Sequence, residues 1–232
     1  MITDGSFTRR ATADEIKPGR VMAYANGRIW YSLTDGLTFR ATDLVGNPES
    51  GSAAYGYKDA ILKETENDFL NEGGDFSVPM TAGIIRAMVP LTTLDTSQGQ
   101  GPLQVFCENG GFSVNTPVDR TEWKNLQYPI ITHSLINTGF SGAQNTIHVN
   151  GDVFGRAPDG IRSFIVARRN FRDWGNTPQS FEVSEIIKYD QGDLLQWGSA
   201  AVFDNRMLMT CQPNWLWTGL DTSGTRTPRE FT

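Results

Sequence analysis

Five acidic residues lie close together in one polar stretch of the chain, and they are the first candidates for chemistry. They are Glu64, Glu66, Asp68, Glu72 and Asp75. A glycosidase needs two carboxyl groups on either side of the scissile bond, one of them with a raised pKa. The stretch supplies such acids, but a run of charges with this spacing is more typical of a solvated face. We expect the solvated face.

Arginines gather in the second half of the chain, and a convergent group of them could bind a substrate carboxylate. They are Arg156, Arg162, Arg168, Arg169 and Arg172. Arg168 and Arg169 directly follow an apolar segment, so we expect them at a strand end that reaches solvent. The arginines therefore give no specific prediction of an anion site.

No other residue pattern indicates catalysis or cofactor binding. His133 and His148 have no third ligand at metal-binding spacing. Nucleophile-elbow, phosphate-loop and dinucleotide fingerprints do not occur. Cys107 and Cys211 have the character of buried small hydrophobes, with a disulfide between blades as the alternative. We therefore predict no catalytic residue, no metal site and no cofactor.

Tryptophans are scattered along the chain and could stack on sugars or nucleobases. They include Trp123, Trp174, Trp197, Trp215 and Trp217. Because they form no local group, core packing or subunit contact is the better prediction.

Turn residues are the most informative sites in this sequence, because Asn-Gly and Asp-Gly pairs favour tight hairpins. The structural turns that we predict comprise Asn26, Gly27, Asp35, Gly36, Asn150, Gly151, Asp159 and Gly160. Residues 32–39 resemble the Asp-box hairpin of sialidase-like propellers, with Thr34 at the place of the aspartate. An Asp-box is a folding device, so this resemblance supports a fold and not glycosidase activity.

Hairpin signatures recur roughly every 45 to 55 residues along the second half of the chain, which is typical of propeller blades. We predict an all-β, β-propeller-like array of about four to five short antiparallel blades. Either the array closes as a small propeller or it is an incomplete part of a larger one. The predicted organisation is a polar arm or linker over 1–20, the propeller-like domain over 21–212 and an irregular tail over 213–232.

Individual segments carry more specific expectations. Residues 59–70 are the best helix candidate, with a loop as the alternative. Residues 161–167 predict an unbroken buried strand, and residues 194–203 predict β-structure. Residues 181–187 fit either a strand or a short helix.

Composition limits the remaining possibilities. With 232 residues and 38% apolar content, the chain can bury a sizeable core and is expected to fold. A net charge of −6 argues against general binding to nucleic acid phosphates. No segment approaches the ~20 apolar residues that cross a bilayer. We expect a protein that is made in the cytoplasm and does not enter a membrane.

Many short phrases resemble a group of bacteriophage virion proteins of the tail nozzle or tubular-tail type. They lie at 65–70, 72–74, 101–106, 112–115, 117–121, 123, 149–152, 159–163, 167–169, 174–178 and 203–209. The resemblance implies a β-propeller body that forms a ring below the portal and has no catalytic residues.

The resemblance further implies a structural virion protein of a phage tail or head-tail neck, which acts by contacts with other virion subunits in a homo-oligomeric ring or tube. An acidic lumen would let DNA pass without specific binding, because like charges repel. The alternative is a carbohydrate-binding propeller or a glycosidase that acts on cell-surface glycans. A third possibility, less favoured by the virion-like phrases, is a propeller that serves as an interaction platform.

Overall fold

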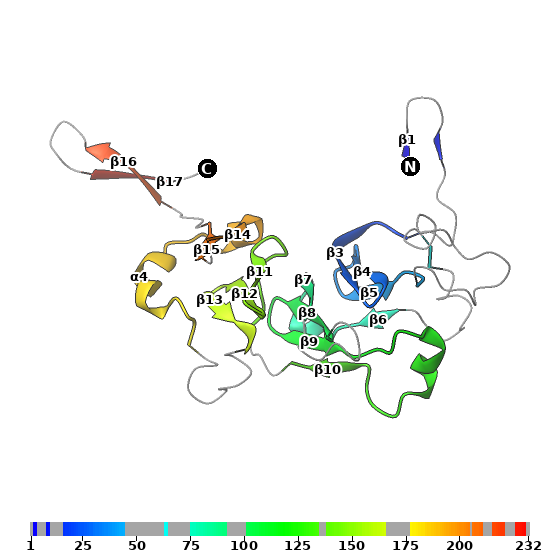
Figure 1. Ribbon diagram of the computed structural model, residues 1–232. Helices are drawn as coiled ribbons and strands as arrows, with labels where there is room; N and C mark the ends of the chain where they lie inside the picture. Colours follow the sequence, from blue (N-terminus) through cyan, green and yellow to red (C-terminus); the bar gives the residue numbers. More distant parts are fainter. Residues whose placement is uncertain are drawn as a thin grey trace. The chain divides into compact units, whose positions relative to one another are not determined.

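The computed structural model describes the backbone of most of the chain and divides it into two compact units. The described residues are 2–3, 8–9, 16–44, 63–64, 75–91, 101–134, 138–165, 177–204, 206–210, 215–220 and 226–230. Unit 1 comprises Met1–Val105 and Phe112–Thr132, and unit 2 comprises Phe106–Gly111 and His133–Thr232. Figure 1 shows the elements of both units.

The first four-stranded sheet belongs to unit 1 and has the order β3-β4-β5-β6. Its strands are β3 (Gly19–Ala25), β4 (Arg28–Leu33), β5 (Thr38–Ala41) and β6 (Phe76–Ser77). Consecutive strands pair antiparallel. Asn26 and Gly27 join β3 to β4 with φ values of 52° and 74°. This left-handed backbone is the one that a two-residue hairpin turn requires.

An aromatic cluster forms the core of unit 1 on one face of this sheet. The rings of Trp30 and Trp123 stack with centroids 5.7 Å apart, and those of Phe39 and Phe76 stack at 5.5 Å. Register explains the grouping, because Phe39 lies opposite Ser32 and Phe76, on the side of the sheet to which Trp30 also points. Burial of four large rings supplies most of the local driving force.

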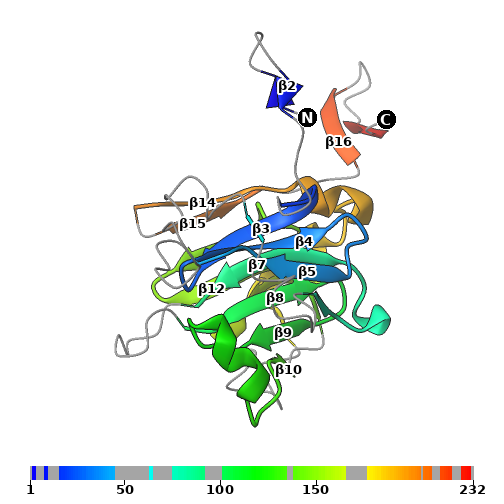
Figure 2. The same cartoon turned by 90° about the vertical axis from the view of Figure 1, so that its right-hand side faces the viewer.

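A second four-stranded sheet has the order β10-β9-β8-β7, as Figure 2 shows. Its strands are β7 (Ile85–Pro90), β8 (Leu103–Cys107), β9 (Gly111–Val114) and β10 (Ile131–His133). Every residue of β8 and β9 is buried. The two buried polar side chains of these strands bind each other, since the Ser113 hydroxyl donates to Gln104 Oε1 at 2.9 Å. Short 3-10 helices flank the two sheets at Met80–Ala82 and Arg120–Asn125.

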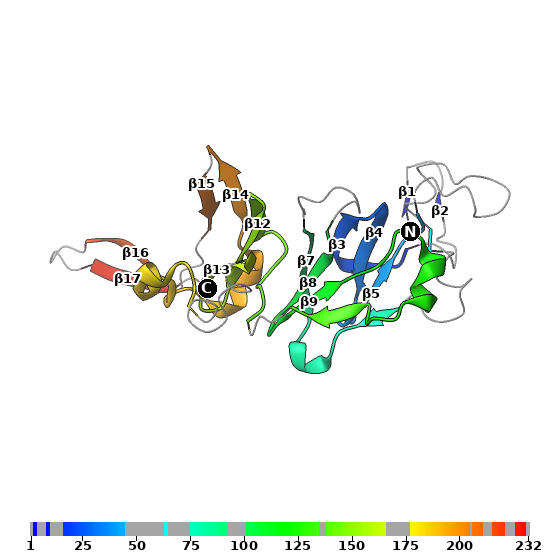
Figure 3. The same ribbon diagram turned by 60° about the horizontal axis from the view of Figure 1, so that its bottom comes forward.

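Unit 2 contains a three-stranded antiparallel sheet, β11-β12-β13, and a separate hairpin, β14-β15. The strands are β11 (Thr146–Val149), β12 (Asp152–Ala157), β13 (Gly160–Ser163), β14 (Ala200–Phe203) and β15 (Arg206–Met209). Figure 3 shows β14 between β15 and the β12 strand. Rings of Phe106, Phe140 and Phe164 form the core of this unit.

Two glycines make the close packing of unit 2 possible. A Cβ atom on Gly139 would overlap the backbone carbonyl of Cys107. A Cβ atom on Gly155 would overlap the ring of Phe140. Only hydrogen can occupy these places, so both positions require glycine for steric reasons.

Three segments of unit 2 test the element predictions. Residues 181–187 form a 3-10 turn, Phe181–Val183, followed by the short helix α4, Ser184–Ile187, so the helical alternative is confirmed. The unbroken strand expected over 161–167 is wrong, because β13 ends at Ser163 and residues 164–165 are helical. The β-structure expected over 194–203 begins only at Ala200, after the 3-10 helix Gly192–Trp197.

The remaining elements lie toward the two ends of the chain. β1 (Ile2–Thr3) pairs with β2 (Thr8–Arg9) inside the region expected to be a polar arm. β16 (Trp215–Leu220) pairs with β17 (Arg226–Glu230) inside the region expected to be an irregular tail. The helix expected at 59–70 lies outside the described residues except for positions 63 and 64. The described fold is all-β, built from small antiparallel sheets with short helical connections.

Candidate functional site

The densest group of ionisable side chains lies on the face of the first sheet opposite the aromatic cluster. It consists of Tyr31, Arg40, Glu64 and Asp75, and we name it the Arg40 cluster. The Tyr31 hydroxyl donates to Glu64 Oε2. Arg40 donates to Glu64 Oε1 at 2.8 Å and to Asp75 Oδ2 at 2.8 Å. One guanidinium therefore holds both carboxylates.

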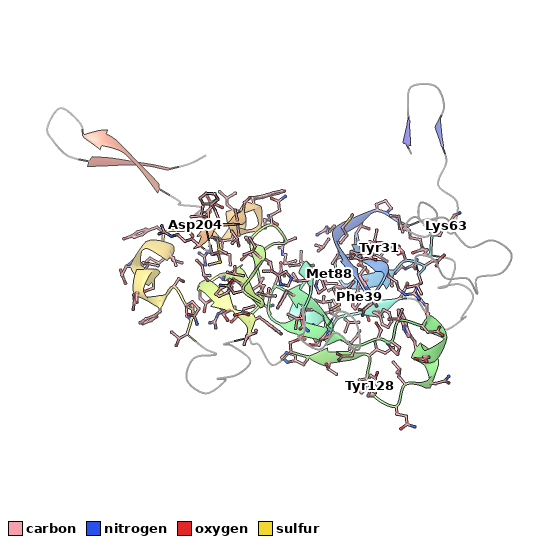
Figure 4. The ribbon with its side chains drawn as sticks, in the orientation of Figure 1. Tyr31, Phe39, Lys63, Met88, Tyr128 and Asp204 are labelled. Atoms are coloured by element: carbon pink, nitrogen blue, oxygen red, sulfur yellow. The ribbon has the colours of Figure 1, made fainter. Side chains whose placement is uncertain are left out.

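Strand register places the members of the Arg40 cluster together. Tyr31 on β4 lies directly opposite Arg40 on β5, so both side chains point to the same face. The segment that carries Glu64 is fixed to the sheet by the backbone, since Asp43 N–H donates to the Lys63 carbonyl at 2.9 Å. Figure 4 labels Tyr31 and Lys63 in this region and Phe39 on the neighbouring strand.

Electrostatics assign Tyr31 the role of a neutral hydrogen-bond donor. Burial raises the pKa of the Tyr31 hydroxyl well above its ordinary value, and its hydrogen bond to Glu64 raises the pKa further. Burial opposes the charge of Arg40, but its hydrogen bond to Asp75 and the attraction of Glu64 outweigh that effect and raise the pKa of Arg40.

This arrangement does not match the two-carboxylate form of glycoside hydrolysis. That form uses one protonated carboxyl group and a second carboxylate on either side of the scissile bond. Glu64 and Asp75 are instead both bound to Arg40, and Glu64 is buried. Glu66, Asp68 and Glu72 lie outside the described residues. Among the described residues, the Arg40 cluster therefore serves to attach the Glu64 segment to the sheet.

The predicted turn at Asp35 and Gly36 joins β4 to β5. Asp35 Oδ1 accepts the N–H groups of Leu37 and Thr38 at 3.0 and 2.9 Å, and Oδ2 accepts the Thr38 hydroxyl at 2.6 Å. The Thr38 hydroxyl is the largest cause of a lowered pKa at Asp35. Asp35 thus binds the turn from a position one residue after that of the Asp-box aspartate.

Asn150 and Gly151 connect β11 to β12, and their φ values are 50° and 81°. Asp159 lies in the connection between β12 and β13, where its Oδ1 accepts from Arg162 Nε at 3.1 Å, and Gly160 is the first residue of β13, opposite Ala157. All eight predicted turn residues therefore lie at hairpin connections or their closing pairs.

Asp152 makes contacts that could not be predicted from its position beside a turn. Its Oδ1 accepts the N–H groups of Val153 at 2.6 Å and Ile165 at 3.0 Å, and its Oδ2 accepts the Ser163 hydroxyl. The bond to Ile165 redirects the backbone after β13. This explains why the predicted strand ends at Ser163, since a backbone N–H bonded to a side chain is lost to the ladder.

Of the five candidate arginines, the two that the structure describes bind different acidic residues. Arg156 forms a buried ion pair with Asp190 at 2.9 Å. Arg162 pairs with Asp159 at the β12–β13 turn. Arg168, Arg169 and Arg172 lie outside the described residues. In the part of the chain that the structure describes, no group of three histidine, cysteine, aspartate or glutamate side chains could hold a metal ion.

The tryptophans and cysteines take different environments. Trp123 is buried, and the guanidinium carbon of Arg120 lies 4.5 Å from its ring centroid. Trp197 is 69% exposed. Burial raises the pKa of the Cys107 thiol to about 12, so this thiol is unreactive. Trp174 and Cys211 lie outside the described residues, and only the backbone of Trp215 and Trp217 is described.

Sequence reasoning did not predict the Arg40 cluster or the stack of Trp30, Trp123 and Arg120. Part of the Arg40 cluster has a signal in the sequence, because a tight turn at Asp35-Gly36 places Tyr31 on β4 opposite Arg40 on β5. The ring stack depends on a contact between segments about 90 residues apart, for which the sequence carries no local signal.

Comparison with protein-family models, curated proteins and solved structures finds no match to this chain. Within the described residues, no helix is both long enough and apolar enough to cross a membrane.

Proposed function

We propose that the chain is a structural virion subunit of a phage tail or head-tail neck, built as a propeller-like series of blades. It acts through contacts with other virion subunits, in a homo-oligomeric ring or tube, and not through turnover. The virion-like phrases of the sequence suggest the setting, and the arrangement of the sheets supports the architecture.

The observation that carries the proposal is the position of the first strand of each sheet. In unit 1 the first strand of the second sheet, β7, lies beside the first strand of the first sheet, β3. In unit 2 the first strands β11 and β14 are likewise neighbours. Blades of a propeller pack in this way, with their initial strands toward a common axis and their later strands outward.

The chemistry of the described side chains is consistent with a structural role. The Arg40 cluster, Asp35, Asp152 and the Arg156–Asp190 pair all bind other parts of their own unit. Each uses its polar groups to hold a turn or a segment.

Electron microscopy of the purified protein, alone and within phage particles, tests the proposal. We expect rings or tubes of the purified protein and density for it at the tail or neck of the particle. Absence of the protein from purified particles, measured by mass spectrometry, would contradict the virion role. A monomer with two face-to-face sheet layers would contradict the propeller.

Carbohydrate binding is the second candidate, and exposed Trp197 is the observation that favours it. A solvated indole offers a flat apolar surface on which a sugar ring can stack. Binding of the purified protein to immobilised cell-surface glycans, lost in a Trp197→Ala variant, would favour this candidate over assembly.

A further inference from the structure

Among the described residues, the β15 edge of the β14–β15 hairpin pairs with no further strand, and its hydrogen-bonding pattern is defined. Thr210 N–H donates to the Ser199 carbonyl at 2.9 Å, so this pair is hydrogen bonded. Bonded and non-bonded pairs alternate along an antiparallel ladder. The pair Ala201 and Leu208 is therefore bonded within the hairpin. The backbone groups of Met207 and Met209 point away from β14.

Outward backbone groups on two other strands of unit 2 are bonded to neighbouring segments. On β14, Ala200 N–H donates to the Gln144 carbonyl at 2.9 Å. On β13, the Ile161 carbonyl accepts from Gln179 N–H at 2.8 Å, and Ile161 N–H donates to Ser180 Oγ at 2.9 Å. Among the described strands, β15 pairs only with β14.

The side chains of the hairpin are apolar and exposed. Phe203 is 73% exposed and Leu208 is 57% exposed, and strand register places them on the same face. Natural edge strands are usually protected by charges, proline or a bulge. After Arg206, β15 reads Met207, Leu208, Met209, without any of these devices.

We propose that this edge pairs with the same edge of a second copy of the chain, antiparallel and centred on Leu208. In this register Met207 of each copy faces Met209 of the other, so all four outward backbone groups of Met207 and Met209 in each copy are bonded. Leu208 meets Leu208 of the second copy in the closely spaced non-bonded position. The result is a four-stranded sheet across the two copies, with as many strands as the β3-β4-β5-β6 sheet.

Charge is compatible with self-association at this edge. The described tip and second strand of the hairpin contain one acid, Asp204, and one base, Arg206, so the patch is neutral within a chain of net charge −6. Figure 4 labels Asp204 there. The proposed register places Arg206 opposite Thr210 of the second copy, so no like charges face each other.

The available area sets the strength of the contact. Only side chains of β15 meet across the contact, chiefly Leu208 with Leu208 and Met207 with Met209, because Phe203 lies on β14, one strand away. The buried area is therefore small. Stable interfaces bury about 1,200–2,000 Å² in total. The pair is therefore a weak, reversible dimer that forms as concentration rises. Because a contact with two-fold symmetry does not generate a ring, it is a separate contact from that of the proposed function.

Sedimentation velocity over a range of protein concentrations tests the contact. We expect the unchanged protein to dimerise reversibly, and Leu208→Lys and Leu208→Glu each to weaken dimerisation by about tenfold or more, because like charges would meet at the centre. An equimolar mixture of the two variants should regain dimers, since opposite charges then face each other. Met22→Lys, an exposed methionine on β3, is the matched control and should dimerise normally.

Rescue in the mixture distinguishes the symmetric register from a general loss of apolar surface, which mixing would not restore. A protein that stays monomeric at all concentrations, or a Leu208→Lys variant that dimerises normally, would overturn the proposal. Failure of the mixture to dimerise would also overturn it. Met207→Pro removes an outward N–H without breaking a hairpin bond, and it should weaken the dimer while the thermal unfolding of the monomer stays close to that of the parent. None of these results depends on whether the protein occurs in phage particles.

Discussion

Acidic side chains of this protein bind backbone N–H groups near hairpin turns. Asp35 accepts two such groups and Asp152 accepts two more. A carboxylate in this position accepts hydrogen bonds from backbone N–H groups that the turn leaves without a partner in the strand ladder. Asp152 has the wider role, because Ser163 is the last residue of the neighbouring strand β13 and Ile165 lies just beyond that strand.

We expect Asp152→Ala to destabilise the protein by about 1–3 kcal/mol, because the partly buried N–H of Ile165 and the Ser163 hydroxyl lose their acceptor. Chemical denaturation followed by circular dichroism measures the change. Asp193→Ala is the matched control, since Asp193 is exposed, and it should stay within about 0.5 kcal/mol of the parent. Equal stability of the two variants would contradict the structural role of Asp152.

The turn residues could be predicted because their signal is local. Asn26-Gly27 and Asn150-Gly151 need positive φ at both positions, and these residue types reach it at low cost. The partners of Asp152 could not be predicted in the same way. A bond to Ile165 joins residues that are distant in sequence, and the identity of the donor depends on how the chain returns.

At the scale of elements, the two faces of the first sheet carry different side-chain clusters. One face carries the aromatic cluster of Trp30, Phe39, Phe76 and Trp123, and the other carries the Arg40 cluster. Because side chains alternate along a strand, β4 contributes Trp30 to one face and Tyr31 to the other. The sheet is thus held from both sides.

Removal of the Tyr31 hydroxyl tests whether the Arg40 cluster is structural. We expect Tyr31→Phe to lower the free energy of unfolding by about 1–3 kcal/mol, because buried Glu64 loses a donor. Tyr24→Phe is the control, since Tyr24 is 54% exposed on β3, and it should have little effect. If Tyr31→Phe instead kept full stability but abolished binding or turnover of a glycan, the cluster would be a functional site.

Strand existence was predictable from hydrophobic patterning, whereas strand length was not. The text of β3, β4 and β5 alternates around turn residues and forms strands where expected. Residues 161–167 are equally apolar, but the Asp152 contact to Ile165 ends the strand. Residues 192–197 form a 3-10 helix whose Leu195 carbonyl accepts from Asn145 Nδ2 at 2.7 Å. Both departures come from bonds between distant segments.

At the scale of the whole molecule, charge is the property that the sequence defines most directly. The chain has 26 acidic residues and 20 lysines and arginines. Proteins that bind DNA without sequence preference do so by neutralising phosphates with basic side chains. An excess of acids opposes that interaction. This is consistent with the proposed role in a tail or neck ring through which DNA passes without binding.

We therefore expect no retardation of duplex DNA by this protein at physiological salt in an electrophoretic mobility assay. A basic DNA-binding protein of similar size serves as the positive control. Retardation that weakens steeply as salt rises would reveal a local basic surface and would contradict passage of DNA without binding.

The all-β class could be predicted from composition and turn spacing, and the described sheets agree with it. The number of strands per sheet could not. Among the described sheets, two have four strands, one has three, and three, including β14–β15, have two. Whether a sheet gains a further strand depends on backbone groups at its edge, such as those of Met207 and Met209, and side-chain patterning does not encode them.

The contact between Gly139 and the Cys107 carbonyl limits how this protein can vary. No substitution at position 139 avoids the overlap, because every other amino acid carries a Cβ atom. Gly192 has no atom within 4 Å of a built Cβ and accepts a larger residue without this conflict. In a saturation library selected for folding, we expect position 139 to keep only glycine and position 192 to accept other residues. The two positions therefore serve as internal controls for how strictly the library was selected.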